Sequence, residues 1–155
     1  HINWNSKPLR IALQRESEVQ NIYTGAMACD HSGEYLLVGD QVGNVHMWKL
    51  IDNEPKLSSV KESILENDIS SIVSINQEEF VLTNGHNQVK FWNVKYDTFE
   101  EIRTPDKYGS IQSICSFQHR LILGTKMNYI ISKDIYQDDF NILMRVIKAH
   151  THSMP

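Results

Sequence analysis

Short segments in which apolar and polar residues alternate recur along most of the chain. Alternation with a period of two is typical of half-buried β-strands, and these segments are also rich in β-branched and aromatic residues. No stretch keeps a 3.6-residue apolar period over the length of a helix. The clearest strand segments are ISSIVSI (69–75), EFVLTN (79–84), QVKFWNV (88–94) and TFEEIRT (98–104). We therefore predict that the whole chain is β.

The strand pattern repeats along the chain. The segment LVGDQVGNVHMW (37–48) aligns with VLTNGHNQVKFW (81–92) at an offset of 44, and LILGTKMNYIIS (121–132) aligns with the second copy at a further offset of 40. In the third copy Ser132 replaces Trp92. The other aligned pairs there are Leu121 with Val81, Tyr129 with Val89 and Ile131 with Phe91. A repeat of this length is typical of the four-stranded blade of a WD40-type β-propeller.

We predict an all-β fold that forms a segment of a WD40-type β-propeller. About three four-stranded blades are expected, at residues 22–63, 69–104 and 111–147. Residues 1–21 are expected to end a preceding blade, and residues 148–155 to begin a following one. Propellers typically have four to eight blades, so three blades cannot close a ring. Further blades are therefore expected, from the same chain or from another one.

Several residues are predicted to hold structural positions of the repeat. Gly43 and Gly109 lie where the chain must turn, and glycine readily adopts the positive φ that such turns require. Trp48 and Trp92 occupy the same repeat position, which favours packing between neighbouring blades over a unique ligand site. In WD40 repeats, a histidine at the place of His150 often forms a hydrogen bond within its blade. No individual partner-binding residue is predicted.

The segment PDKYGSIQSICSF (105–117) is predicted to join two blades. Pro105 is expected to end one outer strand, Gly109 to turn the chain inward, and Cys115 to pack as a small buried residue of the next inner strand. A reactive Cys115 would need an activating base nearby. His119 lies roughly 13 Å away along an extended strand. We therefore predict no catalytic residue and no enzyme activity.

Composition and charge narrow the classes of partner. The chain has 155 residues and a formal net charge of −4, so no overall basic field attracts nucleic acid or an anionic membrane. No apolar run approaches the roughly 20 residues of a membrane-spanning helix. The two cysteines, Cys29 and Cys115, form no Cys-x-x-Cys motif, and such sparse cysteine usage suits a reducing compartment. A cytoplasmic protein is expected.

Metal and cofactor sites are also not expected. His150 and His152 could share one face of a strand, but no third ligand lies close in sequence. Asp138 and Asp139 lack the ligand spacing of a calcium loop. The sequence contains no glycine-rich phosphate loop and no catalytic serine or zinc motif.

One run of residues resembles a specific family. A Pro-Asp-x-Tyr-Gly linker, a LILGT strand, an NYII strand and an Ala-His-Thr segment occur in this order within residues 101–154. The same order is found in the echinoderm microtubule-associated-protein-like family. The sequence departs from the usual repeat in two respects. Lys49 follows Trp48 and Asn93 follows Trp92, where the WD motif has aspartate. The dipeptide Ala149-His150 stands where Gly-His is common.

The resemblance implies a non-catalytic cytoskeletal protein with tandem propellers that binds tubulin or microtubules through loops on its propeller faces. The alternative is a general WD40 scaffold in signalling, trafficking or ubiquitin transfer, without tubulin binding. An enzyme would instead require a deep central pocket with convergent titratable groups.

Overall fold

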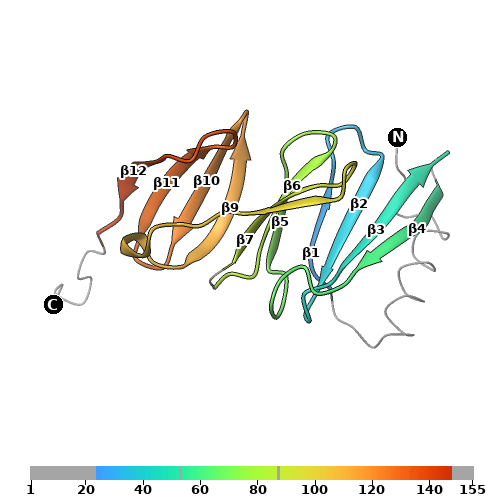
Figure 1. Cartoon of the computed structure of the whole chain (residues 1–155), viewed down its shortest axis with the longest axis horizontal. Helices are drawn as coiled ribbons and strands as arrows, with labels where there is room; N and C mark the ends of the chain where they lie inside the picture. Colours follow the sequence, from blue (N-terminus) through green and yellow to red (C-terminus); the bar gives the residue numbers. More distant parts are fainter. Residues whose placement is uncertain (1–23, 53, 87, 148–155) are drawn as a thin grey trace, which may run out of the picture.

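The computed structural model describes residues 24–52, 54–86 and 88–147 of the chain (Figure 1). Twelve strands in these residues form three four-stranded antiparallel sheets. The first sheet contains β1 (Thr24–Cys29), β2 (Tyr35–Asp40), β3 (Val45–Ile51) and β4 (Glu54–Lys61). The second contains β5 (Ser71–Ser74), β6 (Glu79–Thr83), β7 (Val89–Asn93) and β8 (Thr98–Glu101). The third contains β9 (Ile111–Phe117), β10 (Arg120–Thr125), β11 (Tyr129–Asp134) and β12 (Phe140–Arg145).

Each sheet is a meander in which strands adjacent in sequence pair with one another. The prediction of an all-β chain with three four-stranded units is therefore confirmed. One short 3-10 turn, η1 (Asp106–Tyr108), interrupts the connection between the second and third sheets.

The predicted flanking strands at 1–21 and 148–155, together with His150 and His152, lie outside the described residues. The described part of the chain has no helix that is long and apolar enough to cross a membrane.

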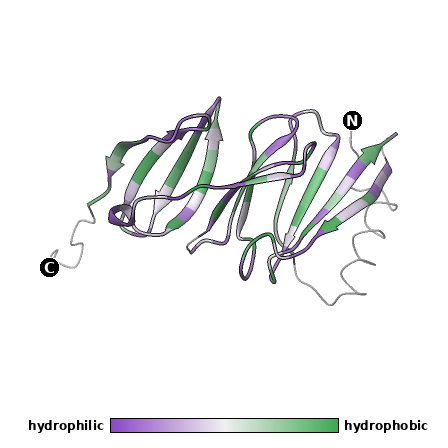
Figure 2. Ribbon diagram, in the orientation of Figure 1, coloured by the Kyte–Doolittle hydropathy of each residue, from purple (hydrophilic) through white to green (hydrophobic). Residues whose placement is uncertain are grey.

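The three sheets stand in a row, and buried apolar side chains fill the two spaces between them (Figure 1). Between the first and second sheets lie Leu37, Val45 and Met47 from one side and Ile72, Phe80, Leu82 and Trp92 from the other. Between the second and third sheets lie Val81 and Val89 against Leu121, Leu123 and Ile131. Hydrophobic residues accordingly gather on the strands and hydrophilic ones in many of the turns (Figure 2).

The alignment of the third repeat is wrong by one residue. The last pairs before the three equivalent turns are Gly39 with Val45, Thr83 with Val89 and Gly124 with Ile130. Ile130, rather than Tyr129, therefore takes the position of Val89. Lys133, rather than Ser132, takes the position of Trp92. Because side chains alternate between the faces of a sheet, this shift assigns every residue of the hairpin to the other face.

The corrected register explains how the sheets stack. Leu121 and Leu123 face the second sheet, as Phe80 and Leu82 of the second sheet face the first. The opposite face of the third sheet carries Ile122 and Ile130, which are only half-buried. At the equivalent place Val81 is fully buried. Within the described residues the row thus ends on a partly uncovered apolar face, as expected for a segment of a larger stack.

The predicted structural residues can now be placed. Gly43 has a φ of 93°, and its carbonyl oxygen accepts hydrogen bonds from the N–H groups of Ile64 (2.8 Å) and Leu65 (3.3 Å). Gly109 has a φ of 80° and packs against Met127. Pro105 does not end the outer strand, because β8 already ends at Glu101; it precedes the 3-10 turn instead.

The two tryptophans are both buried, on corresponding faces of their sheets. Trp92 packs between the first and second sheets and stacks on Phe99, with ring centroids 5.1 Å apart. Trp48 packs with Leu36 and Val38 on the face of the first sheet that points away from the second. Both side chains therefore act as packing residues in the described structure.

Candidate functional site

The two cysteines lie in different environments. Cys115 is exposed, so the expectation that it packs in the core is wrong. It pairs with Ile122 and points away from the second sheet, whereas its neighbour Ile114 points toward that sheet. Burial, with a smaller contribution from the carboxylate of Asp30, raises the pKa of the Cys29 thiol, which disfavours the nucleophilic thiolate.

Metal ligands are not brought together in the described ranges. No group of three or more His, Cys, Asp or Glu side chains within them could hold an ion. Asp138 and Asp139 lie exposed in the turn before β12.

One end of the three sheets is built from turns that are tied to one another. The β2–β3, β6–β7 and β10–β11 turns lie at this end, together with the β4–β5 and β8–β9 connections. We call this surface the turn face; it comprises residues 40–44, 62–70, 84–86, 88, 102–110 and 125–129. The N–H of Ile69 donates to the carbonyl of Asp40 (2.9 Å), and the N–H of Lys126 to that of Ser110 (2.9 Å). Each connection is thus held against a neighbouring hairpin turn.

A second pair of contacts links the first connection to the second sheet. Nδ2 of Asn84 donates to the carbonyl of Glu66 at 3.1 Å. The N–H of Glu66 donates to Oε1 of Gln88 at 2.6 Å. The connection that leaves the first sheet is therefore fixed against the β6–β7 turn of the second sheet, which gives the turn face a defined shape.

The side chains that cap the hairpin turns were missed in the sequence. Oδ1 of Asp40 accepts the N–H groups of Val42 and Asn44, both at 2.9 Å. Oδ1 of Asn84 plays the same part in the second sheet, and Oγ1 of Thr125 accepts one turn N–H in the third. Aspartate, asparagine and threonine commonly cap turns in this way. The signal was available, because Asp40 and Asn84 occupy the same column of the repeat.

Side chains of both charge signs stand exposed on the turn face. Glu66 is exposed on the first connection and Lys107 on the second. His86 and Lys126 come from adjacent hairpin turns, and Nζ of Lys126 lies 3.5 Å from Nδ1 of His86. Such a mixed, fixed array suits recognition of a protein surface rather than of a polyanion.

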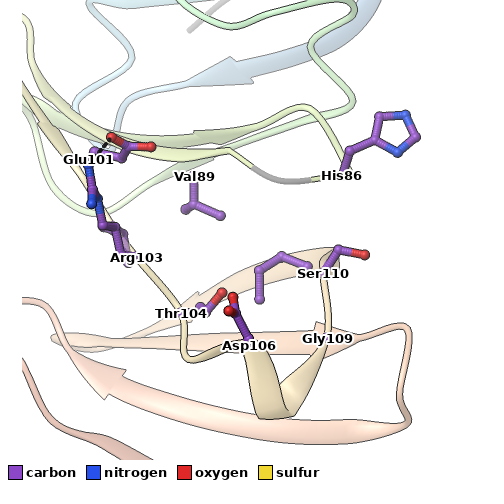
Figure 3. Close-up of a pocket in the computed structure, with 10 residues that line it drawn as sticks. His86, Val89, Glu101, Arg103, Thr104, Asp106, Gly109 and Ser110 are labelled. Carbon is purple, nitrogen blue, oxygen red and sulfur yellow. Dashed lines mark ion pairs between the residues drawn. The ribbon is translucent and has the colours of Figure 1, made fainter.

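A groove separates the second and third sheets on their outer side. It contains two cavities, of about 370 Å³ and 280 Å³, which share Glu101, Ile102 and Arg103 as a common wall. The larger cavity is also lined by Val89 and Asp106, and Figure 3 shows the Asp106 carboxylate pointing into it.

The smaller cavity lies between β7–β8 and the turn that precedes β12. Its remaining wall comes from Phe91, Lys133, Ile135, Asp138 and Phe140. Both cavities together are called the inter-sheet groove below.

Comparison with known proteins shows the fold. The N-terminal domain of Nup159 matches with a TM-score of 0.62 and 10% sequence identity, over 77% of this chain and 33% of that one. The WD40 repeats of RRP9 match with a TM-score of 0.61 and 13% identity, over 77% and 36%. U3-55K gives the same values. The fold is that of a WD40-type β-propeller segment. The chain spans about a third of each of these propeller structures.

No protein-family model and no curated protein matches the sequence. At 10% to 13% identity, the structural neighbours show the WD40-type fold. The resemblance to the echinoderm microtubule-associated-protein-like family receives no support from these comparisons.

Proposed function

We propose that this WD40-type segment is part of a non-catalytic scaffold that binds a protein partner through its turn face. The observation that carries the proposal is the network of hydrogen bonds between connections and hairpin turns. The contacts from Ile69 to Asp40, from Asn84 to Glu66 and from Lys126 to Ser110 hold loops of three sheets in fixed positions. Loops that are already ordered lose little conformational entropy on binding.

The exposed side chains of the turn face supply the specificity. Glu66 presents a carboxylate beside the β6–β7 turn, and His86 of that turn and Lys126 of the next present a polar and a cationic group. In protein interfaces, a few such residues carry most of the binding energy. A partner with complementary charges therefore binds this surface in one orientation.

Charge reversal on the turn face, compared with charge reversal at the opposite end of the sheets, tests this proposal. Affinity purification with the full chain is expected to lose its specific partners when Glu66→Lys and Lys126→Glu are combined. Glu34→Lys is the matched control, because Glu34 is exposed in the β1–β2 turn at the opposite end of the first sheet. Retention of the same partners by the double variant, or equal loss in the control, would reject the turn face as the binding surface.

Tubulin is a second candidate partner, favoured by the resemblance within residues 101–154. In this proposal the protein is cytoplasmic and cytoskeletal, and Lys107 and Lys126 of the turn face meet an acidic tubulin surface. Cosedimentation of the full-length protein with assembled microtubules across a salt series tests it. Pelleting that weakens with salt supports tubulin binding. A protein that stays in the supernatant at low salt rules it out and leaves the scaffold proposal intact.

A further inference from the structure

We propose that the inter-sheet groove binds an extended segment of a partner protein in which lysine or arginine alternates with apolar residues. The inference rests on the proposed function in that the partner is a protein. The larger cavity of the groove borders the turn face and shares residues of the β8–β9 connection with it, whereas the smaller cavity extends away from the turn face between the outer strands of the second and third sheets.

The groove offers space and an apolar floor. Its two cavities, of about 370 Å³ and 280 Å³, are each large enough for a side chain, and they lie on either side of the wall formed by residues 101–103. Phe91, Ile135 and Phe140 line the smaller cavity and are only half-buried. Apolar side chains of a bound segment would complete the burial of these three residues.

The backbone of β8 adds a template for an extended segment. β8 is the terminal strand of its sheet, and all four of its residues are exposed. The outward N–H and C=O groups of such an edge can pair with another strand. The edge strand of the first sheet differs, because β4 contains Pro55 and two lysines, Lys56 and Lys61, that disfavour pairing. β8 contains Glu100 and Glu101 instead, which repel acidic segments and attract basic ones.

The charges along the groove determine which charge the bound segment must carry. Arg103 lies 3.6 Å from Glu101, so their charges offset one another. Lys133 is buried and donates to the carbonyl of Asp134 at 3.2 Å. Glu100, Asp106 and Asp138 make no ion pair within the described residues, and the groove therefore has a surplus of negative charge.

Geometry joins these features into one site. Glu100 pairs with Phe91 across β7 and β8, and thus points to the side of the sheet that faces the groove. Asp138 faces it from the third sheet. Lysine and arginine can lay their aliphatic stems along an apolar floor while their charged ends reach carboxylates at its rim. A segment of alternating apolar and basic residues matches both requirements.

Fluorescence anisotropy with a labelled peptide of alternating valine and lysine tests the inference. The full chain is expected to bind this peptide and not a matched peptide in which glutamate replaces lysine. The double variant Glu100→Gln/Asp138→Asn is expected to weaken binding about tenfold, which corresponds to about threefold for each exposed ion pair. Glu34→Gln/Glu54→Gln removes two exposed carboxylates outside both the groove and the turn face and should leave the affinity unchanged.

Each outcome decides the question. If the two peptides bind equally well, or if both double variants lose the same affinity, the groove is rejected as the binding site for a basic segment. Sedimentation of the chain alone adds a further test: a dimer that dissociates in Glu100→Gln/Asp138→Asn would mean that a second copy occupies the groove. Glu100→Gln/Asp138→Asn changes no residue of the turn face, so this variant should still recover the partners that the combination of Glu66→Lys and Lys126→Glu loses. Failure of the turn face and failure of the groove are therefore distinguishable.

Discussion

Asp40 and His46 form a buried contact across the β2–β3 hairpin. Oδ2 of Asp40 lies 3.0 Å from Nε2 of His46, and 1% and 5% of the two side chains are exposed. The other carboxylate oxygen of Asp40 accepts the N–H groups of Val42 and Asn44. One side chain therefore fixes this turn of the turn face and ties it to β3.

Replacing Asp40 separates these two contributions. Asp40→Ala removes the contact with His46 and leaves two turn N–H groups without their acceptor, so we expect a loss of about 3 to 5 kcal/mol in the free energy of unfolding. Asp40→Asn keeps an acceptor for the turn, as Asn84 does in the second sheet, and should cost about 1 kcal/mol. Urea denaturation measures both. Equal losses would show that the turn cap contributes little.

Gly43 and Gly33 allow a matched comparison of backbone strain. Both have positive φ, of 93° and 74°. A Cβ at Gly43 would lie 1.9 Å from the carbonyl oxygen of Leu65, whereas one at Gly33 has nothing within 4 Å. Gly33→Ala should therefore cost about 1 kcal/mol, from the left-handed conformation alone. Gly43→Ala should cost at least about 3 kcal/mol, because the β4–β5 connection must also move. Similar thermal midpoints for the two variants would contradict this.

The sequence predicts the strands and the number of sheets because alternation is a local signal. It does not predict the register of the third repeat, since LILGTK and NYIIS contain apolar residues on both faces of their strands. Periodicity alone could not decide between Ser132 and Lys133 as the counterpart of Trp92. Hydrogen-bond pairing across the turn decides it. For the same reason, Cys115 was assigned to the wrong face.

The sequence could not predict the turn face or the inter-sheet groove, for a different reason. The contact between Glu66 and Asn84 spans two sheets, and so does the groove between Glu100 and Asp138. Such pairs lie far apart in the chain, and only the stacking of the sheets brings them together. The turn caps Asp40 and Asn84 could have been found, because they share a repeat column and belong to a residue class that favours turns.

Trp92 is expected to be a major source of stability. It is fully buried and stacks on Phe99, and its Nε1 donates to Oδ1 of Asp97 at 3.2 Å. Trp92→Ala should lower the free energy of unfolding by about 3 to 5 kcal/mol. Tyr96→Ala is the control, because this aromatic residue of the neighbouring turn is 68% exposed, and it should change stability by less than about 0.5 kcal/mol. A small effect of Trp92→Ala in chemical denaturation would contradict the proposed packing.

Asp97 links stability to pH. The hydrogen bond from Lys61, with a smaller contribution from Trp92, lowers the pKa of the Asp97 carboxyl below its usual 3.8. Nζ of Lys61 lies 2.8 Å from Oδ2 of Asp97, so the contact joins β4 of the first sheet to the β7–β8 turn of the second. A carboxyl whose pKa is lower in the folded state stabilises that state above the unfolded pKa. This contribution disappears as the pH falls through the folded pKa. Asp97→Asn should therefore be less stable than the original chain at neutral pH, and the difference should shrink below pH 3.8.

Urea denaturation at a series of pH values measures this convergence. The effect should be small, because 49% of the Asp97 side chain is exposed and solvent screens the pair. Lys61→Met is the matched comparison, because it removes the same ion pair from β4 and should therefore also destabilise the chain at neutral pH. Added salt should reduce the Asp97 effect at neutral pH, because screening weakens an exposed ion pair. A difference that stays constant across the pH series would show that the Lys61–Asp97 contact does not form in solution.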